Sequence, residues 1–258
     1  DRGSVKIAPP DDMETCGMTK TQQLVQQFGK AIAQGEYPAG ASLPSEAELC
    51  SRYLASRNVV REVIRVLSTK RLIDAQAHRG LFVMPRQNWN YLDVDVLGWV
   101  LEKSPDPTLI ASLIEVRSLI EPVISRWAAE RATAVDLVAI EASYNAMANY
   151  NGDLARFHEA DIAFHKAILL ATHNVVIQQL SDAISALQRA IFDYTLFAAD
   201  QHMALTLKEH CDLFEAIRRQ NPEAAERHSH TMVQRTAVRA QQSAAAPEDA
   251  AVPLTAPS

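Results

Sequence analysis

The sequence has few cysteines, and their spacing matches no common disulfide or zinc motif. Its 258 residues include only Cys16, Cys50 and Cys211, an odd number with no closely spaced pair. Secreted disulfide frameworks and zinc knuckles need paired cysteines, and a chain of this length can bury a core without them. We therefore expect reduced thiols in a cytoplasmic protein.

Long apolar runs are also missing. No stretch approaches the roughly 18 to 20 apolar residues of a membrane-spanning helix, and no basic stretch followed by an apolar one opens the chain. The sequence predicts a soluble protein that is neither exported nor embedded in a membrane. Residues 1–18 and 242–258 have the composition of disordered tails.

Charge is distributed unevenly along the chain. The net charge of −6 would by itself count against nucleic-acid binding. Residues 19–86, however, hold ten Lys and Arg against five Asp and Glu, whereas residues 87–241 hold thirteen against twenty. This division predicts a basic N-terminal module joined to an acidic C-terminal one.

Residues 19–86 have the pattern of a winged helix-turn-helix. An amphipathic helix from Thr19 precedes a short helix over about 45–53, where Ser45 and Glu48 fit a capping box. Ser56 is suited to cap a third helix whose outer side is basic. Two short β-compatible runs follow, and the turn between them predicts a hairpin or wing.

Residues 90–241 give no strand signal and contain only amphipathic segments of helical length. The fold class is therefore mainly α, with a winged helix-turn-helix followed by an all-α helical bundle. Proline residues and an Asn-Gly pair, which interrupt helices, separate these segments. The expected helices cover about 92–103, 107–130, 134–150, 153–171, 174–197, 203–219 and 222–241.

Polar residues stand in the apolar stripes of three of these helices. Arg117, Asp161, His165 and His210 all occupy or border positions where the helical period asks for an apolar residue. Because a lone buried charge is costly, their convergence predicts a shared cavity for a ligand or metal. The alternative is that each group is satisfied separately, for example Arg117 by Asp161 or Glu121. We expect His158, His173 and His202 at the surface or in helix caps.

Two parts of the chain resemble a known family. The stretch SLPSEAELCSRYLASRNVVREVIRVLSTKRLIDAQAHRGLFV is similar to the winged helix-turn-helix of GntR-type regulators. Three short stretches further along the chain resemble the FadR C-terminal (FCD) effector domain. They are EVRSLIEP, DIAFH and the EH that precedes AIRRQNPEAAE. Together these parts cover about residues 19–241. WNYLDVDVLGWVLE resembles the family's regulators of sugar-acid operons.

The resemblance implies a homodimeric repressor that binds double-stranded operator DNA. Arg57 and Arg61 would meet the bases and phosphates of the major groove, while the wing tip would reach the minor groove. Ala47 stands where several relatives have an arginine that contacts DNA. An exposed basic helix face that is merely solvated is the alternative. The candidate DNA-contacting residues are Arg57, Asn58, Arg61, Ser45, Ser56, His78, Arg79 and Gly80.

The resemblance also implies a small carboxylate effector, an aldonate such as D-galactonate, that releases the repressor from DNA. Arg117 would hold its carboxylate, and Asp161, His165 and His210 would bind its hydroxyls or a divalent metal, with Zn²⁺ the first choice. A hexuronate or gluconate is the alternative effector. Because two His and a carboxylate also form open iron sites, a metal-dependent helical enzyme is the alternative function.

The implied metal site departs from the family pattern. Many relatives have a third histidine 22 residues after the position of His210, where this chain has Met232. A thioether is a poor ligand for hard or borderline ions. His228, one helical turn earlier, is the possible fourth ligand, whereas His230 should point away. Three protein ligands, or direct hydrogen bonds from these residues to the effector without a metal, remain open.

Overall fold

The computed structural model describes residues 17–76, 79–102, 106–195 and 203–245. Its contacts divide the chain into two compact units, Asp1–Ser104 and Pro105–Ser258, which are described separately. No helix within the described ranges is long and apolar enough to cross a membrane. Cys50 and Cys211 are free thiols, and Cys16 lies outside the described residues.

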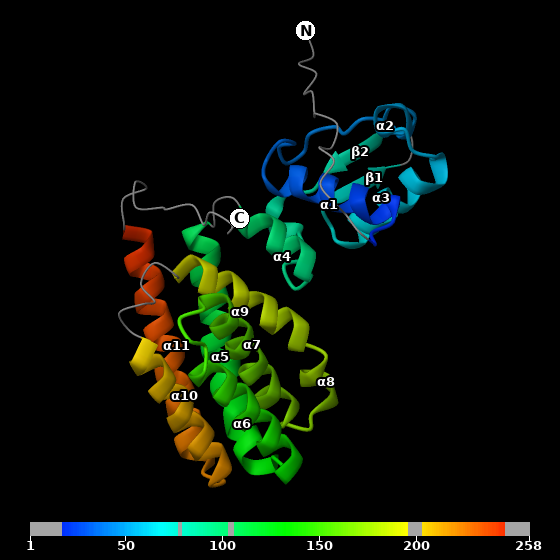
Figure 1. Cartoon of the computed structure of the whole chain (residues 1–258). Coiled ribbons are helices and arrows are strands. Elements are labelled where there is room, and N and C mark those ends of the chain that lie inside the picture. Colours follow the sequence, from blue (N-terminus) through cyan, green and yellow to red (C-terminus); the bar gives the residue numbers. More distant parts are fainter. Residues whose placement is uncertain (1–16, 77–78, 103–105, 196–202, 246–258) are drawn as a thin grey trace. The chain divides into compact units, whose positions relative to one another are not determined.

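The first unit is a small helical domain with a two-stranded hairpin (Figure 1). Leu24 and Phe28 of α1 and Val60, Val63 and Leu67 of α3 are buried where these two helices pack together. Ser45 and Ser56 cap α2 and α3 as the sequence predicts. The elements are α1 (Lys20–Ala33), α2 (Glu46–Tyr53), α3 (Arg57–Thr69), β1 (Ile73–Gln76), β2 (Gly80–Val83), the 3₁₀ helix η1 (Arg86–Asn88) and α4 (Val94–Leu101).

The hairpin is supported along its second edge. β1 and β2 are antiparallel, and β2 also binds the segment that precedes α2. The amide of Leu43 donates to the carbonyl of Leu81 at 2.8 Å, and the amide of Val83 donates to the carbonyl of Ala41 at 3.0 Å. The wing is therefore anchored to the body of the domain rather than isolated, since two paired strands alone are only marginally stable.

Helix α4 packs on α1 within the first unit. The Nζ of Lys70 lies 2.7 Å from oxygens of Asp93 and of Asp95, at the start of α4. The ring of Trp99 lies against Gly29, where no larger side chain has room. Residues 90–102 thus belong with the winged helix-turn-helix, which differs from the boundary expected at residue 90, because the apolar face of α4 is buried against α1.

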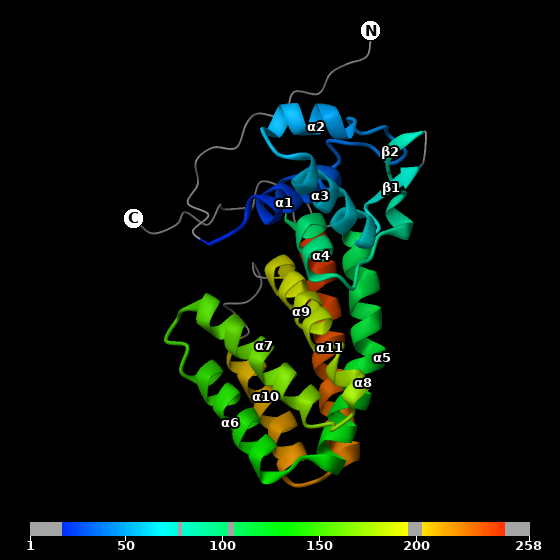
Figure 2. The ribbon, with the colours of Figure 1, turned by 90° about the vertical axis from the view of Figure 1, so that its right-hand side faces the viewer.

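The second unit is a helical bundle (Figures 1 and 2). The two long helices α5 and α11 lie side by side, α6 packs on α7, and α10 packs on α11. Its elements are α5 (Pro107–Arg131), α6 (Ala134–Ala148), α7 (Leu154–Leu170), α8 (Val175–Gln178), α9 (Ser181–Thr195), α10 (Met203–Arg218) and α11 (Pro222–Ala245).

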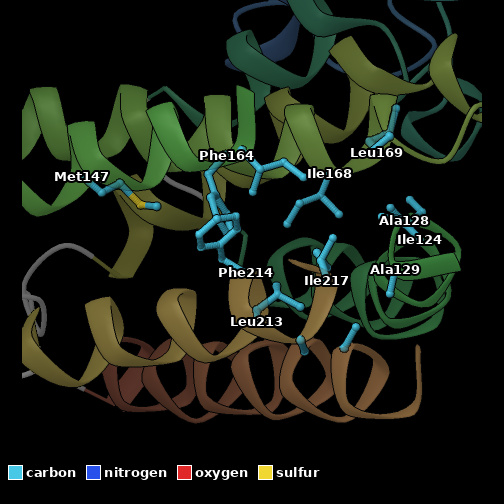
Figure 3. Packing of buried hydrophobic residues seen from close by; sticks show 14 of the residues in the cluster. Ile124, Ala128, Ala129, Met147, Phe164, Ile168, Leu169, Leu213, Phe214 and Ile217 are labelled. Atoms are coloured by element: carbon cyan, nitrogen blue, oxygen red, sulfur yellow. The ribbon is translucent and has the colours of Figure 1, made fainter. Parts of the chain in front are cut away.

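The core of the bundle is apolar and drawn from several helices. Figure 3 shows Phe164 and Ile168 of α7 facing Leu213 and Ile217 of α10, with Ile124 of α5 beside them. All five side chains are buried. Burying apolar area in this way is the main stabilising contribution to such a bundle.

The helix boundaries differ from expectation in two places. The single helix expected over 174–197 is broken into α8 and α9, with the amide of Leu180 donating to the carbonyl of Ile177 at 2.9 Å. This turn lets both residues pack against the core. Helix α11 continues to Ala245, so residues 242–245 are helical rather than part of a disordered tail. Residues 1–16 and 246–258 lie outside the described residues.

Candidate functional site

The first turn of α3 presents a basic, exposed surface. Arg57, Asn58 and Arg61 are all exposed. The hydroxyl of Ser56 accepts a hydrogen bond from the amide of Val59 at 3.4 Å, which begins the helix. This turn therefore carries long side-chain donors on its outer side and a partial positive charge at its N-terminus, both of which suit a phosphate backbone.

Arg61 already has a partner. Its Nε lies 3.0 Å from a carboxylate oxygen of Glu46 on α2, although both side chains are largely exposed. An exposed pair of this kind contributes little stability and is easily exchanged for another anion. The contact therefore links the short helix α2 to the candidate recognition helix without occupying Arg61 permanently.

Ser45 is engaged in the capping box of α2. Its amide and its hydroxyl both donate to Glu48 at 2.7 Å, and its hydroxyl accepts from the amide of Glu48 at 3.4 Å. The hydrogen bond from the Ser45 hydroxyl holds the pKa of Glu48 below its ordinary value. Ser45 is exposed and lies at a helix N-terminus, so a structural role accounts for it whether or not DNA approaches.

The wing tip carries one exposed cation. The guanidinium of Arg79 lies 5.8 Å from the centre of the Phe82 ring. The backbone amide of Arg79 donates to the carbonyl of Gln76 at 3.1 Å. Gly80 has φ +101°, a conformation that favours glycine and allows the tight return into β2. His78 lies outside the described residues.

In the second unit, Arg117 and Glu121 form a buried ion pair one turn apart on α5. The Arg117 Nε donates to Oε1 of Glu121 at 2.6 Å, and Nη2 donates to Oε2 at 3.1 Å. Burial opposes both charges, but each charge stabilises the other, which raises the pKa of Arg117 and lowers the pKa of Glu121. Of the two partners considered from sequence, Glu121 is the one that binds Arg117 directly.

Asp161 and His165 of α7 meet His210 of α10. The Oδ1 of Asp161 lies 2.7 Å from Nε2 of His210 and 3.6 Å from Nε2 of His165. Burial alone would raise the pKa of Asp161, but the hydrogen bond and charge of His210 lower it well below its ordinary range. The same contact raises the pKa of His210 against the effect of burial, whereas burial lowers the pKa of His165.

These three residues form a group that could hold a metal ion. Their candidate ligand atoms all lie within 4.8 Å of one another. The Nδ1 of His210 lies 2.7 Å from the carbonyl oxygen of Thr206, an arrangement that leaves Nε2 to face a metal. Met232 lines the same pocket, and His228, the possible fourth ligand from sequence, does not belong to the group.

The cluster lies in a pocket between helices of the bundle. The pocket has a cavity volume of about 70 Å³, several times the minimum that one buried water needs. Its wall is partly apolar, with Phe157 and Phe192, and partly polar. A concave site with apolar walls and a few convergent polar groups is typical of a small-molecule site.

Five polar residues that line this pocket were not among the candidates from sequence, namely Gln188, Thr206, Glu209, Thr236 and Arg239. Arg239 donates to the hydroxyl of Thr206 at 3.1 Å, and burial lowers the pKa of Arg239. Its place could have been found from the spacing of Met232, Thr236 and Arg239 on α11, which puts all three on one helical face. Gln188 has a comparable signal, because Ile184, Gln188 and Ile191 share one face of α9.

Two histidines outside the cluster behave differently from each other. His173 is exposed and lies 2.8 Å from a carboxylate oxygen of Asp136, as expected of a surface residue. The surface position expected for His158 is wrong, because its ring is buried and stacks on Phe192 with 3.8 Å between ring centres. His202 lies outside the described residues.

Comparisons with known families match both units. Residues 20–83 match the model of bacterial regulatory proteins of the gntR family, and residues 112–235 match the FCD domain. The chain is 52% identical over 216 residues to the galactonate operon transcriptional repressor of Escherichia coli, which covers 84% of this chain and 94% of that protein. The chain therefore belongs to the GntR family and carries an FCD domain.

More distant relatives agree. The transcriptional repressor NanR of Edwardsiella tarda is 26% identical over 212 residues, which is 80% of each chain. A solved structure of Lar from Listeria monocytogenes superposes with a TM-score of 0.62 over 87% of this chain and 98% of that one, at 16% identity, which shows the fold alone. The chain is a DNA-binding transcription regulator that responds to an effector, so the enzyme considered from sequence is not its class.

Proposed function

We propose that this chain represses a sugar-acid catabolic operon and leaves its operator when an aldonate, D-galactonate first, occupies the pocket of the helical domain. The 52% identity to the galactonate operon repressor is the observation that carries the proposal. A homodimer on double-stranded DNA in the cytoplasm is the arrangement that this function implies. Gluconate and the hexuronates are the competing effectors.

The DNA contacts are assigned to the first unit. Arg57, Asn58 and Arg61 would contact the bases and phosphates of the major groove. Arg79 would enter the minor groove with the wing. Ser45 and Ser56 would donate to phosphates from the starts of α2 and α3. Exposure of all these side chains supports the assignment.

The effector's carboxylate is assigned to the cationic wall of the pocket. Arg117 was the candidate from sequence, and it lines the pocket while both prongs of its guanidinium bind Glu121. Arg239 has no carboxylate at hydrogen-bond distance among the described residues, although Asp161 and Glu209 act on it from further away. Arg239 is therefore the group most in need of an anion, and we assign it to the carboxylate together with Arg117.

A divalent metal would fit beside this carboxylate. Asp161, His165 and His210 supply one oxygen and two nitrogens, the donor set of many Zn²⁺ sites. When bound, the metal would polarise a carboxylate or hydroxyl oxygen of the effector. The chain's own part is to orient the ligands, with the Thr206 carbonyl fixing the ring of His210.

Calorimetry tests the effector assignment. D-Galactonate is titrated into the wild type, into Arg239→Met and into Arg117→Lys, which keeps a charge beside Glu121 but loses the planar fork. Because a charge-assisted hydrogen bond is lost, each variant should bind about tenfold to a hundredfold more weakly. Arg156→Ala, an exposed change on α7, should bind as the wild type does.

The same ligand should release the protein from its operator in a fluorescence titration. An absence of heat with every aldonate tested would overturn the assignment of the effector class, and heat with gluconate or a hexuronate alone would replace D-galactonate by that competitor.

Metal analysis tests the ligand assignment. Protein purified without chelator should contain one divalent ion per chain, lost in His210→Ala and kept in His228→Ala. Loss of metal only in His228→Ala would overturn the three-ligand assignment. Absence of metal from wild type that still binds D-galactonate would favour direct hydrogen bonds from Asp161, His165 and His210.

A further inference from the structure

We propose that the side-chain oxygen of Gln188 recognises a hydroxyl of the effector. This inference rests on the proposed function, since it assigns one more residue to the same pocket. Gln188 comes from α9, and it lines the pocket together with Asp161 and His210. Its exposure is 3%, so its polar atoms need partners from the protein or from a bound ligand.

The orientation of the Gln188 amide is set by an ion pair behind it. Its Nε2 donates to Oε1 of Glu121 at 3.2 Å. The carboxylate of Glu121 is held by two hydrogen bonds from Arg117 and only accepts hydrogen bonds when ionised. The amide cannot turn over, because its oxygen would then face the oxygens of Glu121.

The opposite atom of the amide is left without a partner. The Oε1 of Gln188 is shielded from solvent and has no hydrogen-bond partner within the part of the chain that the structure describes. A buried amide oxygen in this state is unfavourable and gains most from a donor that enters with a ligand.

The chemistry of this atom selects the part of the ligand that it meets. An amide oxygen accepts a hydrogen bond from a hydroxyl and has no proton to give to a carboxylate oxygen. The cations Arg117 and Arg239 serve the anionic end of a sugar acid, so Gln188 serves its polyhydroxy chain. The residue thus favours ligands that carry a hydroxyl at one defined position over those that lack it.

The test measures discrimination between D-galactonate and its monodeoxy analogues, each of which lacks one hydroxyl. By calorimetry, the wild type should bind one of these analogues at least about tenfold more weakly than D-galactonate. Gln188→Met has a similar volume and no acceptor oxygen. It should bind D-galactonate about tenfold more weakly and lose the preference over that analogue.

Controls separate recognition from folding. Gln179→Met changes an exposed glutamine in the turn before α9 and should behave as the wild type. Gln188→Asn has a side chain shorter by one methylene group, so its oxygen should not reach the same hydroxyl and the preference should also be lost. This variant replaces Gln188→Met in the test if Gln188→Met does not fold. Circular dichroism and thermal unfolding show whether each variant folds. If Gln188 had only a structural role, its variants would be less stable but would still prefer D-galactonate over the monodeoxy analogue.

The outcomes distinguish the two proposals. If both Gln188 variants fold and keep the wild-type preference, the role of Gln188 is overturned while the effector assignment stands. If the wild type binds no aldonate, the effector assignment is overturned, and the role of Gln188 with it.

Discussion

Arg117 and Glu121 neutralise each other inside the helical domain, with 9% and 7% of their side chains exposed. Glu121→Ala would leave the guanidinium buried without a carboxylate. We expect the free energy of unfolding to fall by about 3–5 kcal/mol, measured by urea denaturation of the helical domain within the full chain. Arg117→Met combined with Glu121→Leu should recover most of this loss.

A matched control lies on the same helix. Glu115 is exposed, so Glu115→Ala should change the free energy of unfolding by no more than about 0.5 kcal/mol. Equal stability of Glu121→Ala and Glu115→Ala would show that the buried pair is not required.

Gly29 and Gly98 predict opposite effects of the same substitution. A Cβ at Gly29 would clash with the buried ring of Trp99, whereas a Cβ at Gly98 meets nothing within 4 Å. Alanine favours a helix over glycine by up to about 1 kcal/mol, so Gly98→Ala should stabilise the first unit. Gly29→Ala should destabilise it by about 1–3 kcal/mol, because α4 must shift away from α1.

Thermal unfolding of the two variants gives the comparison directly, since both glycines lie in helices of one unit. A rise in Tm for Gly29→Ala as large as that for Gly98→Ala would contradict the close packing of Trp99.

The stability contributed by Asp136 should depend on pH. Burial raises the pKa of Asp136, but hydrogen bonds from Thr133 and His173 lower it below its ordinary 3.8. A carboxylate with a lower pKa in the folded state stabilises above its unfolded pKa, and this contribution disappears as the pH falls through the folded pKa. Asp136→Asn should therefore be less stable than the wild type by about 1 kcal/mol at pH 7.

Denaturation at a series of pH values measures this difference. It should begin to shrink as the pH falls below about 4, because the unfolded carboxyl then binds a proton, and it should disappear once the pH falls below the lower pKa of the folded state. A difference that is the same at pH 7 and pH 3 would mean that the charge of Asp136 makes no contribution.

Arg57→Ala and Arg61→Ala should weaken specific duplex binding, since a bidentate base contact is worth about 1–3 kcal/mol of discrimination. The duplex is one selected from a random pool by the wild-type protein, and binding is followed by fluorescence anisotropy at several salt concentrations. Binding should weaken steeply with salt if phosphate contacts dominate.

Arg156→Ala removes an exposed arginine of the other unit and provides the control for net charge. If all three variants bind the selected duplex as the wild type does, the first turn of α3 is not the recognition surface.

Local interactions were the part of the fold that the sequence made predictable. Ser45 and Glu48 are three residues apart, and so are Ser56 and Val59, so the capping of α2 and α3 depends on neighbours along the chain. Helical periodicity likewise predicted that the polar group around Asp161 faces inward. The same periodicity also places His158 on the face of Asp161 and His165, so its inward position could be predicted, whereas the stacking of its ring on Phe192 could not.

By itself, the sequence determined the mainly helical class, the helix-turn-helix and the inward-facing positions of Asp161, His165 and His210, because each follows from spacing within a helix or from charge composition. Only the tertiary structure decided that His210 of α10 meets Asp161 of α7, that α4 packs on α1 and that Gln188 turns its nitrogen toward Glu121. These outcomes depend on which helices lie side by side, and contacts between helices leave no periodic signal in the chain.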